Sequence, residues 1–363
     1  MSMVVPIYRV LRDGRVERLG EWRHGARRLA LEHDGFPLLG AGEHEVPGEL
    51  PWVFWDMCPA GYLGRQLQRR LPELGLQPDP ARWSAEDALR VLSTHGQDVS
   101  GNLILGDESV ERFRAWQFDN RDAVAQVERI LGEVFEPGDD SSLGGERPKL
   151  VGYRANGEGY FVKFSPVVTT SLGRRWADLL EVEALCARVL RDQGLSATQV
   201  WTSDTPRRRL LHVERYDRLR NRGRAGATTL YWYAMERLGD VSVPVTVVLD
   251  ALIADGHLAP AAVDVAARAQ AFSEAIGNTD THLGNYGLVF DEAGRAELAP
   301  FYDVLPMALA PRHDELPDER LVPRSAPIDE RVHGWVRDLI ERVEQSENVS
   351  REFVATWRRY IGV

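Results

Sequence analysis

Lysine is almost missing from this chain of 363 residues. Lysine and arginine together number 44, yet lysine occurs only at Lys149 and Lys163. Arginine therefore supplies the positive charge wherever a generic surface cation is needed. Because an ammonium is a compact charge and a guanidinium is a planar fork, we expect the two lysines at places that require the smaller group.

Cysteine and long apolar runs are also scarce. Cys58 and Cys186 are the only cysteines, so neither a disulfide framework nor a cysteine zinc site is expected, and a reducing cytoplasm is the expected location. No segment approaches the roughly 18 to 20 consecutive apolar residues that cross a bilayer. The N-terminus, MSMVVPIYRVL, lacks the cationic start and apolar block of a signal peptide. We therefore expect no membrane association.

An excess of positive charge is lacking as well. The formal net charge of −11 argues against direct binding to nucleic acid, whose backbone attracts positive fields. Two arginine-dense stretches, 206–210 and 218–224, are interpreted as solvated surface loops. The nine histidines form no H-x₃-H or H-E-x-x-H pattern, and G-x-S-x-G is absent, so zinc-hydrolase and serine-hydrolase chemistry is disfavoured.

The first part of the chain is predicted to combine short strands with helices. Residues 3–40 carry apolar and β-branched runs separated by Asp-Gly turns. A helix is predicted from about Gly61, and another follows Ser84, a predicted N-cap residue, and ends at Gly96. Residues 121–135 are predicted to form a further helix.

The character of the sequence changes near residue 137. A Gly/Ser/Pro loop leads into a predicted hairpin with its turn at Asn156-Gly157, followed by a periodic helix that ends at Gly194 and by two more strands. From residue 230 the chain is mostly helical, with short strands at YGLVF and AELAPFYDV. A parallel α/β fold would need repeated βα alternation, which is missing.

This order of elements predicts an α+β fold with two lobes, similar to a protein kinase. The predicted parts are an N-terminal α/β subdomain at 1–135, a kinase-like N-lobe at 136–219 and a mainly helical C-lobe at 220–363. The length of the chain agrees with two to three domain-sized units.

The stretch GNTDTHLGNYGLVF suggests phosphoryl transfer. Asp280 and Asn285 have the D-x-x-x-x-N spacing in which the carboxylate is the base and the amide binds a metal. Asp303 is a candidate for the second Mg²⁺ ligand, because oxygen donors suit this ion. Lys163 lies on a predicted strand and is a candidate phosphate contact. Glu183, in the following helix, is its candidate ion-pair partner.

Five motifs together resemble the HipA family of bacterial serine/threonine kinase toxins. They are SSLGGERPK, YFVKFS, HVERYDR, GNTDTHLGN and APFYDVLPM, and they occur in the family order. FWDMCPAGYLGRQL and DVSGNLIL also resemble the N-terminal subdomain of that family. The similarity covers about residues 50 to 330.

The resemblance implies a role for each matching position on the nucleotide side. Lys163 would contact the phosphates of ATP, and the backbone at Glu214 and Tyr216 would hold the adenine in the hinge between the lobes. SSLGGERPK does not match the Walker A pattern. Gly144 and Gly145 in this motif still allow backbone amides to approach an anion.

The resemblance also assigns the catalytic and regulatory positions. Asp280 would be the catalytic base, and Asn285 and Asp303 would hold Mg²⁺. His282 would support the catalytic loop or approach the phosphates. Ser142 corresponds to the autophosphorylated serine of the family, and Ser141 beside it is a second candidate.

The family resemblance predicts an ATP- and Mg²⁺-dependent protein kinase. Its implied substrate is a translation component such as an aminoacyl-tRNA synthetase, and its implied partner is a small DNA-binding antitoxin. Two other functions stay open from the residues alone. One is a small-molecule kinase with the same ATP machinery, and the other is a non-catalytic binding module of a toxin–antitoxin system.

Overall fold

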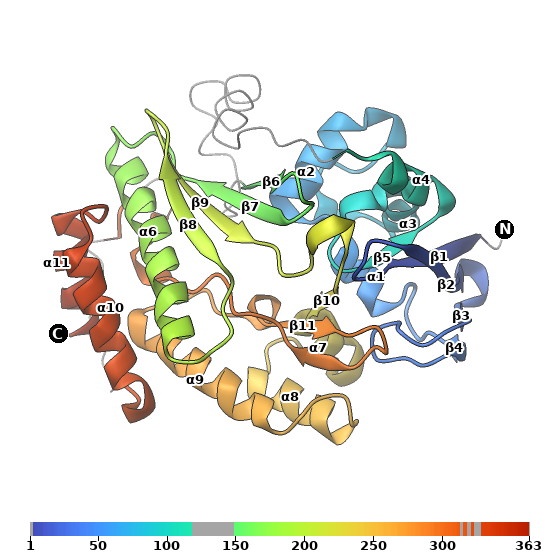
Figure 1. The fold of residues 1–363 in the computed structure, drawn as a ribbon. Coiled ribbons are helices and arrows are strands. Elements are labelled where there is room, and N and C mark those ends of the chain that lie inside the picture. Colours follow the sequence, from blue (N-terminus) through green and yellow to red (C-terminus); the bar gives the residue numbers. More distant parts are fainter. Residues whose placement is uncertain (1–2, 118–148, 313–314, 318–320, 323–327, 363) are drawn as a thin grey trace.

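The computed structural model describes residues 3–117, 149–312, 315–317, 321–322 and 328–362 (Figure 1). The predicted helix at 121–135 and the predicted boundary after residue 135 lie outside these ranges. So do Ser141, Ser142, Gly144 and Gly145, whose predicted roles therefore stay predictions.

The N-terminal subdomain is built on an antiparallel five-stranded sheet with the order β4-β3-β2-β1-β5. Its strands are β1 Val4–Val10, β2 Val16–Arg23, β3 Arg28–Leu31, β4 Gly42–Glu45 and β5 Leu103–Leu105. Its helices are α1 Trp52–Met57, α2 Gly61–Arg70, α3 Ala85–His95 and α4 Asp107–Ala115. Ser84 caps α3 as predicted, because its side chain accepts from the N–H of Asp87 in a capping box.

A second antiparallel sheet forms the N-lobe, with the order β6-β7-β9-β8. Its strands are β6 Lys149–Tyr153, β7 Gly159–Phe164, β8 Val200–Asp204 and β9 Arg209–Glu214. The long helix α6 Ser171–Asp192 lies beside this sheet (Figure 1). The predicted hairpin of β6 and β7 is confirmed, and Gly194 follows α6 with a positive φ of 81°.

The C-lobe is mainly helical, as predicted. Its helices are α7 Leu230–Leu238, α8 Val245–Ala254, α9 Ala261–Ile276, α10 His333–Gln345 and α11 Arg351–Ile361. A small sheet with the order β10-β11-β12 joins β10 Gly226–Thr229, β11 Gly287–Phe290 and β12 Ala296–Leu298. The 3₁₀ turns of the whole chain include η1 His24–Ala26, η2 Pro72–Leu74, η3 Pro80–Arg82, η4 Gly96–Asp98, η6 Arg220–Arg222, η7 Leu283–Asn285, η8 Met307–Leu309 and η9 Glu330–Val332.

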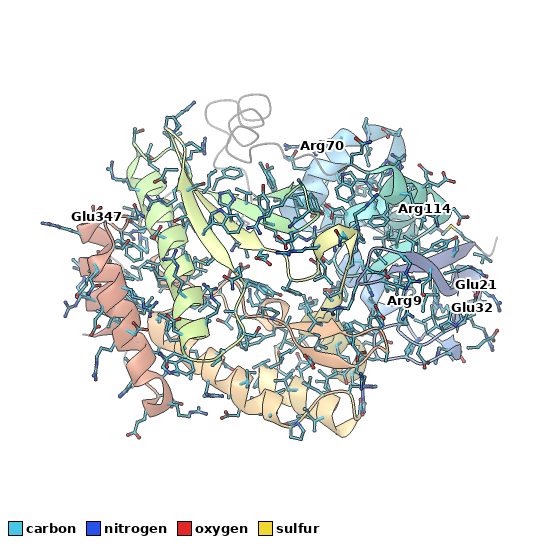
Figure 2. All side chains as sticks on the ribbon, in the orientation of Figure 1. Arg9, Glu21, Glu32, Arg70, Arg114 and Glu347 are labelled. Atoms are coloured by element: carbon cyan, nitrogen blue, oxygen red, sulfur yellow. The ribbon has the colours of Figure 1, made fainter. Side chains whose placement is uncertain are left out.

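One large apolar core joins the N-lobe to the C-lobe. It contains the buried face of α6 together with residues of α8, α9, α10 and α11. The N-terminal sheet has its own core, in which Trp22 and Phe54 are fully buried. Charged side chains such as Arg70, Arg114 and Glu347 project from the outside of the fold (Figure 2). The predicted α+β class is confirmed, and no helix among the described residues is long and apolar enough to span a membrane.

The arginine-dense stretches are not simply solvated loops, so that prediction was wrong. Arg218 and Arg224 are only 4% and 2% exposed, and Arg208 is buried as well. The guanidinium groups of Arg218 and Arg224 reach the loop that follows α3, and Arg208 donates to the carbonyl of Ser165. A buried arginine is tolerated when carboxylates and carbonyls accept its N–H groups, and a single sequence cannot reveal such distant partners.

Candidate active site

Lys163 lies at the centre of the candidate site. It sits on β7 directly opposite Lys149 of β6, so both side chains are on the same face of the sheet. The Lys163 Nζ donates to Glu183 Oε1 at 2.6 Å and also to the carboxylate of Asp303. The three groups come from β7, α6 and the segment after β12. The ammonium of Lys163 therefore links the N-lobe sheet to α6 and to the C-lobe.

The charges of this cluster are strongly coupled. Burial opposes the charged form of Lys163, but the carboxylates of Asp303 and Glu183 outweigh it and raise the lysine pKa. Burial raises the pKa of Glu183 above its ordinary value, and the Lys163 ammonium only partly offsets this effect. Burial also works against the ionised form of Asp303, but Lys163 outweighs it and lowers the pKa of that carboxyl. Asp303 is thus ionised next to an ammonium at neutral pH.

The predicted catalytic loop follows directly from the end of α9. Gly277 ends this helix with a φ of 89°, and the buried Asn278 comes next. The side chain of Asn278 accepts from the N–H of Asp280 at 3.2 Å and donates to the carbonyl of Asp303 at 3.3 Å. One amide therefore fixes the backbone of the candidate base relative to Asp303. The Asp280 side chain itself is exposed, as a group that meets an incoming hydroxyl must be.

His282 and Asn285 close the loop into a short 3₁₀ turn. His282 Nδ1 accepts from the N–H of Gly284 at 3.0 Å, and Asn285 Oδ1 accepts from the N–H of His282 at 2.9 Å. In this geometry His282 supports the loop, one of the two roles expected for it. An amide oxygen has two lone pairs, so Asn285 keeps acceptor capacity for a metal ion.

Tyr302 ties the Asp303 segment to the catalytic loop from the other side. Its hydroxyl donates to the carbonyl of Gly284 at 2.8 Å. Its ring stacks on Tyr216 with a centroid distance of 6.2 Å. Asp303 itself has a φ of 57°, a conformation that costs roughly 1 kcal/mol or more for a residue other than glycine. Such strain persists only where surrounding contacts hold the residue in place.

The donor set fits a magnesium ion. Asp303 and Asn285 offer carboxylate and amide oxygens, and their neighbours Tyr302 and Gly284 are hydrogen-bonded to each other. Mg²⁺ prefers oxygen ligands and is commonly held by one or two protein groups together with phosphates and water. The described residues contain no group of three or more His, Cys, Asp or Glu that could hold a metal.

The candidate hinge runs from Glu214 to Arg218 between β9 and the C-lobe. Glu214 is the last residue of β9, and its N–H donates to the carbonyl of Gln199 at 2.8 Å. Tyr216 packs its hydroxyl against Gly287, where an added Cβ would lie only 2.8 Å from that oxygen. The hinge thus touches the first residue of β11, two positions after Asn285.

Two residues of the site were not predicted from the sequence. Asn278 and Tyr302 hold Asp280, Asn285 and Asp303 in one arrangement. Both stand next to recognised motif positions, and an asparagine directly after a helix-ending glycine is a local signal for a structural amide. The contact of Tyr302 with Gly284 has no local signal, because 18 residues separate the two.

The sequence comparisons agree with this geometry. Residues 141–355 match the family described as HipA-like C-terminal domain, and residues 1–114 match the family described as YjjJ-like toxin, middle domain. The chain is 30% identical over 335 residues to Toxin YjjJ of Escherichia coli strain K12, covering 85% of this chain and 70% of that protein.

A solved structure shares the fold along nearly the whole chain. It is the HipA toxin of Shewanella oneidensis MR-1, determined in a complex of HipA, HipB and its operator DNA. The TM-score is 0.62 with 15% sequence identity, and the match covers 99% of this chain and 95% of that chain. This similarity confirms the predicted kinase-like fold. The chain therefore belongs to the HipA-like toxin family, within which it resembles the YjjJ toxin.

Proposed function

We propose that this protein is an ATP- and Mg²⁺-dependent serine/threonine protein kinase of the HipA type that acts in the cytoplasm. The observation that carries the proposal is the contact of the largely buried Lys163 with the buried Glu183 and the partly exposed Asp303. Phosphoryl transfer needs an ammonium on the phosphates, a carboxylate for the metal and a base for the acceptor hydroxyl. Lys163, Asp303 and Asp280 supply these groups.

Each of these groups has one role in the proposed reaction. The Asp280 carboxylate accepts the proton of a protein hydroxyl while that oxygen attacks the γ-phosphorus of ATP. The bond from the γ-phosphorus to the bridging oxygen breaks, and ADP leaves. Lys163 holds the phosphates, and the backbone at Glu214 and Tyr216 holds the adenine. Mg²⁺, held by Asn285 and Asp303, would neutralise the charge of the phosphate oxygens.

Substrate, partner and regulation are proposed from the family. The acceptor would be a translation component such as an aminoacyl-tRNA synthetase. A small DNA-binding antitoxin is the proposed partner, because the Shewanella HipA was solved together with HipB and operator DNA. Ser142 or Ser141, next to Gly144 and Gly145, would be the autophosphorylation site. A phosphoserine there would repel the phosphates of ATP, since it adds nearly two negative charges.

Mass spectrometry of the protein after incubation with Mg²⁺ and γ-labelled ATP tests the proposal. We expect label on the protein, with phosphate on Ser142 or Ser141. Asp280→Asn should reduce transfer by about 10²- to 10⁴-fold, the range of general base catalysis, while ATP binding is kept. Asp264→Asn is the matched control, because Asp264 is an exposed carboxylate of the same lobe whose ion-pair partner among the described residues is Arg268. Undiminished transfer by Asp280→Asn would show that Asp280 is not the base. Label on a metabolite but on no protein would favour a small-molecule kinase.

A further inference from the structure

A loop of the N-terminal subdomain holds the candidate hinge. Asp98 ends η4, and its Oδ1 accepts from Arg215 Nη1 at 2.9 Å and from Arg218 Nη2 at 3.0 Å. The hydroxyl of Tyr153, on β6, donates to the same oxygen. One carboxylate of the N-terminal subdomain thus joins both the hinge and the N-lobe sheet, although more than a hundred residues separate it from the hinge.

A second carboxylate completes the cluster from the hinge itself. Asp217 accepts from Arg215 Nε and Nη2, both at 3.0 Å, and from Arg218 Nη1 at 2.7 Å. The N–H of Gly101, in the loop after Asp98, donates to Asp217 at 2.8 Å. The guanidinium of Arg218 also binds this loop, because it donates to the carbonyls of Val99 and Gly101 at 2.5 and 3.0 Å.

The cluster is largely buried and has no spare negative charge. The side chains of Arg215, Arg218 and Asp217 are 2%, 3% and 8% exposed, and that of Asp98 is 24% exposed. Two carboxylates face these two guanidinium groups, and a third guanidinium group, that of Arg224, is buried nearby. Burial and the charge of Arg218 lower the pKa of Arg224 to about 9. Loss of the Asp98 charge would therefore add to the positive charge among three buried guanidinium groups.

Arg215 connects this cluster of charges to the proposed nucleotide site. It stands between Glu214 and Tyr216, the two proposed adenine contacts. Its N–H donates to the carbonyl of Gly159 at 2.8 Å, and its guanidinium lies 5.0 Å from the centroid of Phe161, two residues before Lys163 on β7. The backbone that would face the adenine is therefore held from one side by β7 and from the other by Asp98.

We propose that Asp98 is a positioning residue through which the N-terminal subdomain sets the affinity for ATP. The proposal rests on the proposed kinase function, since it assumes that the hinge binds adenine. Asp98 is expected to act mainly on the adenine end of the nucleotide, because Arg215 and Arg218 of the hinge are its ion-pair partners among the described residues. The direct partners of the Lys163 ammonium are Glu183 and Asp303, so we expect a smaller effect on the groups that bind the phosphates.

Calorimetry with a non-hydrolysable ATP analogue and Mg²⁺ tests this role. Asp98→Asn keeps the shape of the side chain and removes its charge. We expect its Kd for the analogue to rise about tenfold, which corresponds to the loss of one charge-assisted hydrogen bond. Inhibition by Mg²⁺-tripolyphosphate, which has no adenine, should stay within about twofold of the wild type. A purely structural role would weaken both ligands alike or neither.

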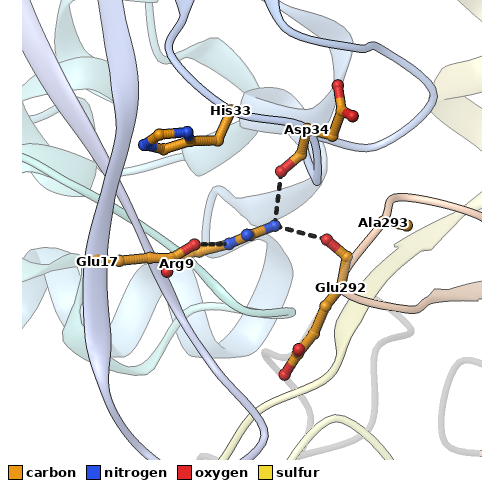
Figure 3. A pocket seen from close by; sticks show the side chains of 6 residues that line it. All are labelled: Arg9, Glu17, His33, Asp34, Glu292 and Ala293. Atoms are coloured by element: carbon orange, nitrogen blue, oxygen red, sulfur yellow. Dashed lines mark hydrogen bonds and ion pairs between the residues drawn. The ribbon is translucent and has the colours of Figure 1, made fainter.

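Arg9→Gln is the matched control within the same subdomain. Arg9 Nη1 donates to the carbonyls of Asp34 and Glu292 at 2.8 and 2.7 Å and so joins β1 to the turn after β11 (Figure 3). These residues line a pocket of about 520 Å³ that contains none of the candidate catalytic groups. The control should bind the analogue like the wild type, because it loosens the subdomain without touching the hinge.

Each outcome decides the proposal. If Asp98→Asn binds the analogue within twofold of the wild type, the positioning role is wrong. If this variant does not fold, Tyr153→Phe decides instead, because it keeps the Asp98 charge and removes the hydroxyl that donates to Asp98 and accepts from Arg215 Nη1 at 3.3 Å. Its Kd should rise about two- to threefold, and an unchanged value overturns the proposal. If the wild type itself does not bind the Mg²⁺-bound analogue, the proposed kinase function fails, independently of Asp98.

Discussion

At the scale of single residues, Lys163 explains why a lysine is kept in a chain that otherwise uses arginine. Its ammonium contacts both Glu183 and Asp303 through a single nitrogen atom, which a compact charge can do and a planar guanidinium cannot. Lys149 lies opposite it on β6 and contributes to the low pKa of Asp303. Both lysines are thus on the face of the N-lobe sheet that contacts Asp303.

The raised pKa of Glu183 predicts a pH dependence of stability. In the folded protein this carboxyl keeps its proton at a pH at which the unfolded chain has lost it. The free energy of unfolding should therefore fall as the pH rises from 4.5 towards 7, with a slope of at most about 1.4 kcal/mol per pH unit from this group. Glu183→Gln should remove this part of the slope. Urea denaturation at several pH values measures it, and equal slopes for both proteins would contradict the prediction.

Most residues of the candidate site could be predicted from local sequence, but their strain and contacts could not. Asp280 and Asn285 are recognisable because one short loop must carry both. The positive φ of Asp303 and its ion pair with Lys163 depend on a partner 140 residues away. No local pattern contains that information.

At the scale of elements, the end of α9 places the catalytic loop. Gly277 has a positive φ, and a Cβ added there would lie 2.5 Å from Cε1 of Tyr360 on α11. The carbonyl before this glycine accepts from Trp357 Nε1 of α11 at 2.9 Å. The last helix therefore packs on the residues from which the loop to Asp280 begins.

Gly277→Ala should cost more stability than a positive φ alone explains. The backbone strain contributes about 1 kcal/mol, and displacement of the Tyr360 ring adds about 1–3 kcal/mol. Gly239→Ala is the control, because this residue ends α7 with a φ of 69° and has no atom within 4 Å of an added Cβ. Denaturant unfolding of both variants measures the difference. An equal loss of stability in the two variants would mean that the Tyr360 ring moves aside without a cost in free energy.

Helices with strong local signals were predicted well, and so were the short strands β11 and β12, but two other short elements were not. The capping box of α3 and the periodicity of α6 are properties of contiguous residues. The short helix α1 and the strand β10 were missed. Each is short, and each is stabilised by the other, since Asp56 of α1 binds Thr228 and Thr229 of β10.

At the scale of the whole molecule, buried carboxylates attach the N-terminal subdomain to the kinase-like core. Asp98 reaches the hinge, and Asp56 reaches the small sheet of the C-lobe. Asp56 accepts from the hydroxyls of Thr228 and Thr229 at 2.8 and 2.6 Å and from the N–H of Thr229 at 2.8 Å. Burial raises the pKa of this carboxyl, and the three hydrogen bonds from Thr228 and Thr229 oppose that rise.

Asp56→Asn should therefore destabilise the whole chain. An amide has one oxygen, so at least one of the three donors loses its acceptor, at a cost of about 1–3 kcal/mol. Asp13→Asn, at an exposed turn of the same subdomain, should leave the unfolding midpoint unchanged. Differential scanning calorimetry of both variants makes the comparison. A midpoint for Asp56→Asn equal to that of the wild type would show that this contact does not hold the subdomain.

The sequence by itself determined the class of the fold and the family, and it supplied the residues proposed for the chemistry. These depend on contiguous patterns: a strand that carries Lys163, a loop that carries Asp280 and Asn285, and periodic helices around them. The tertiary structure alone decided what the arginine-dense stretch after β9 does. Arg218 and Arg224 are buried because carboxylates and carbonyls from another subdomain accept their hydrogen bonds. These hydrogen bonds offset the cost of burying the two guanidinium groups, and they form only when folding brings residues distant in sequence together.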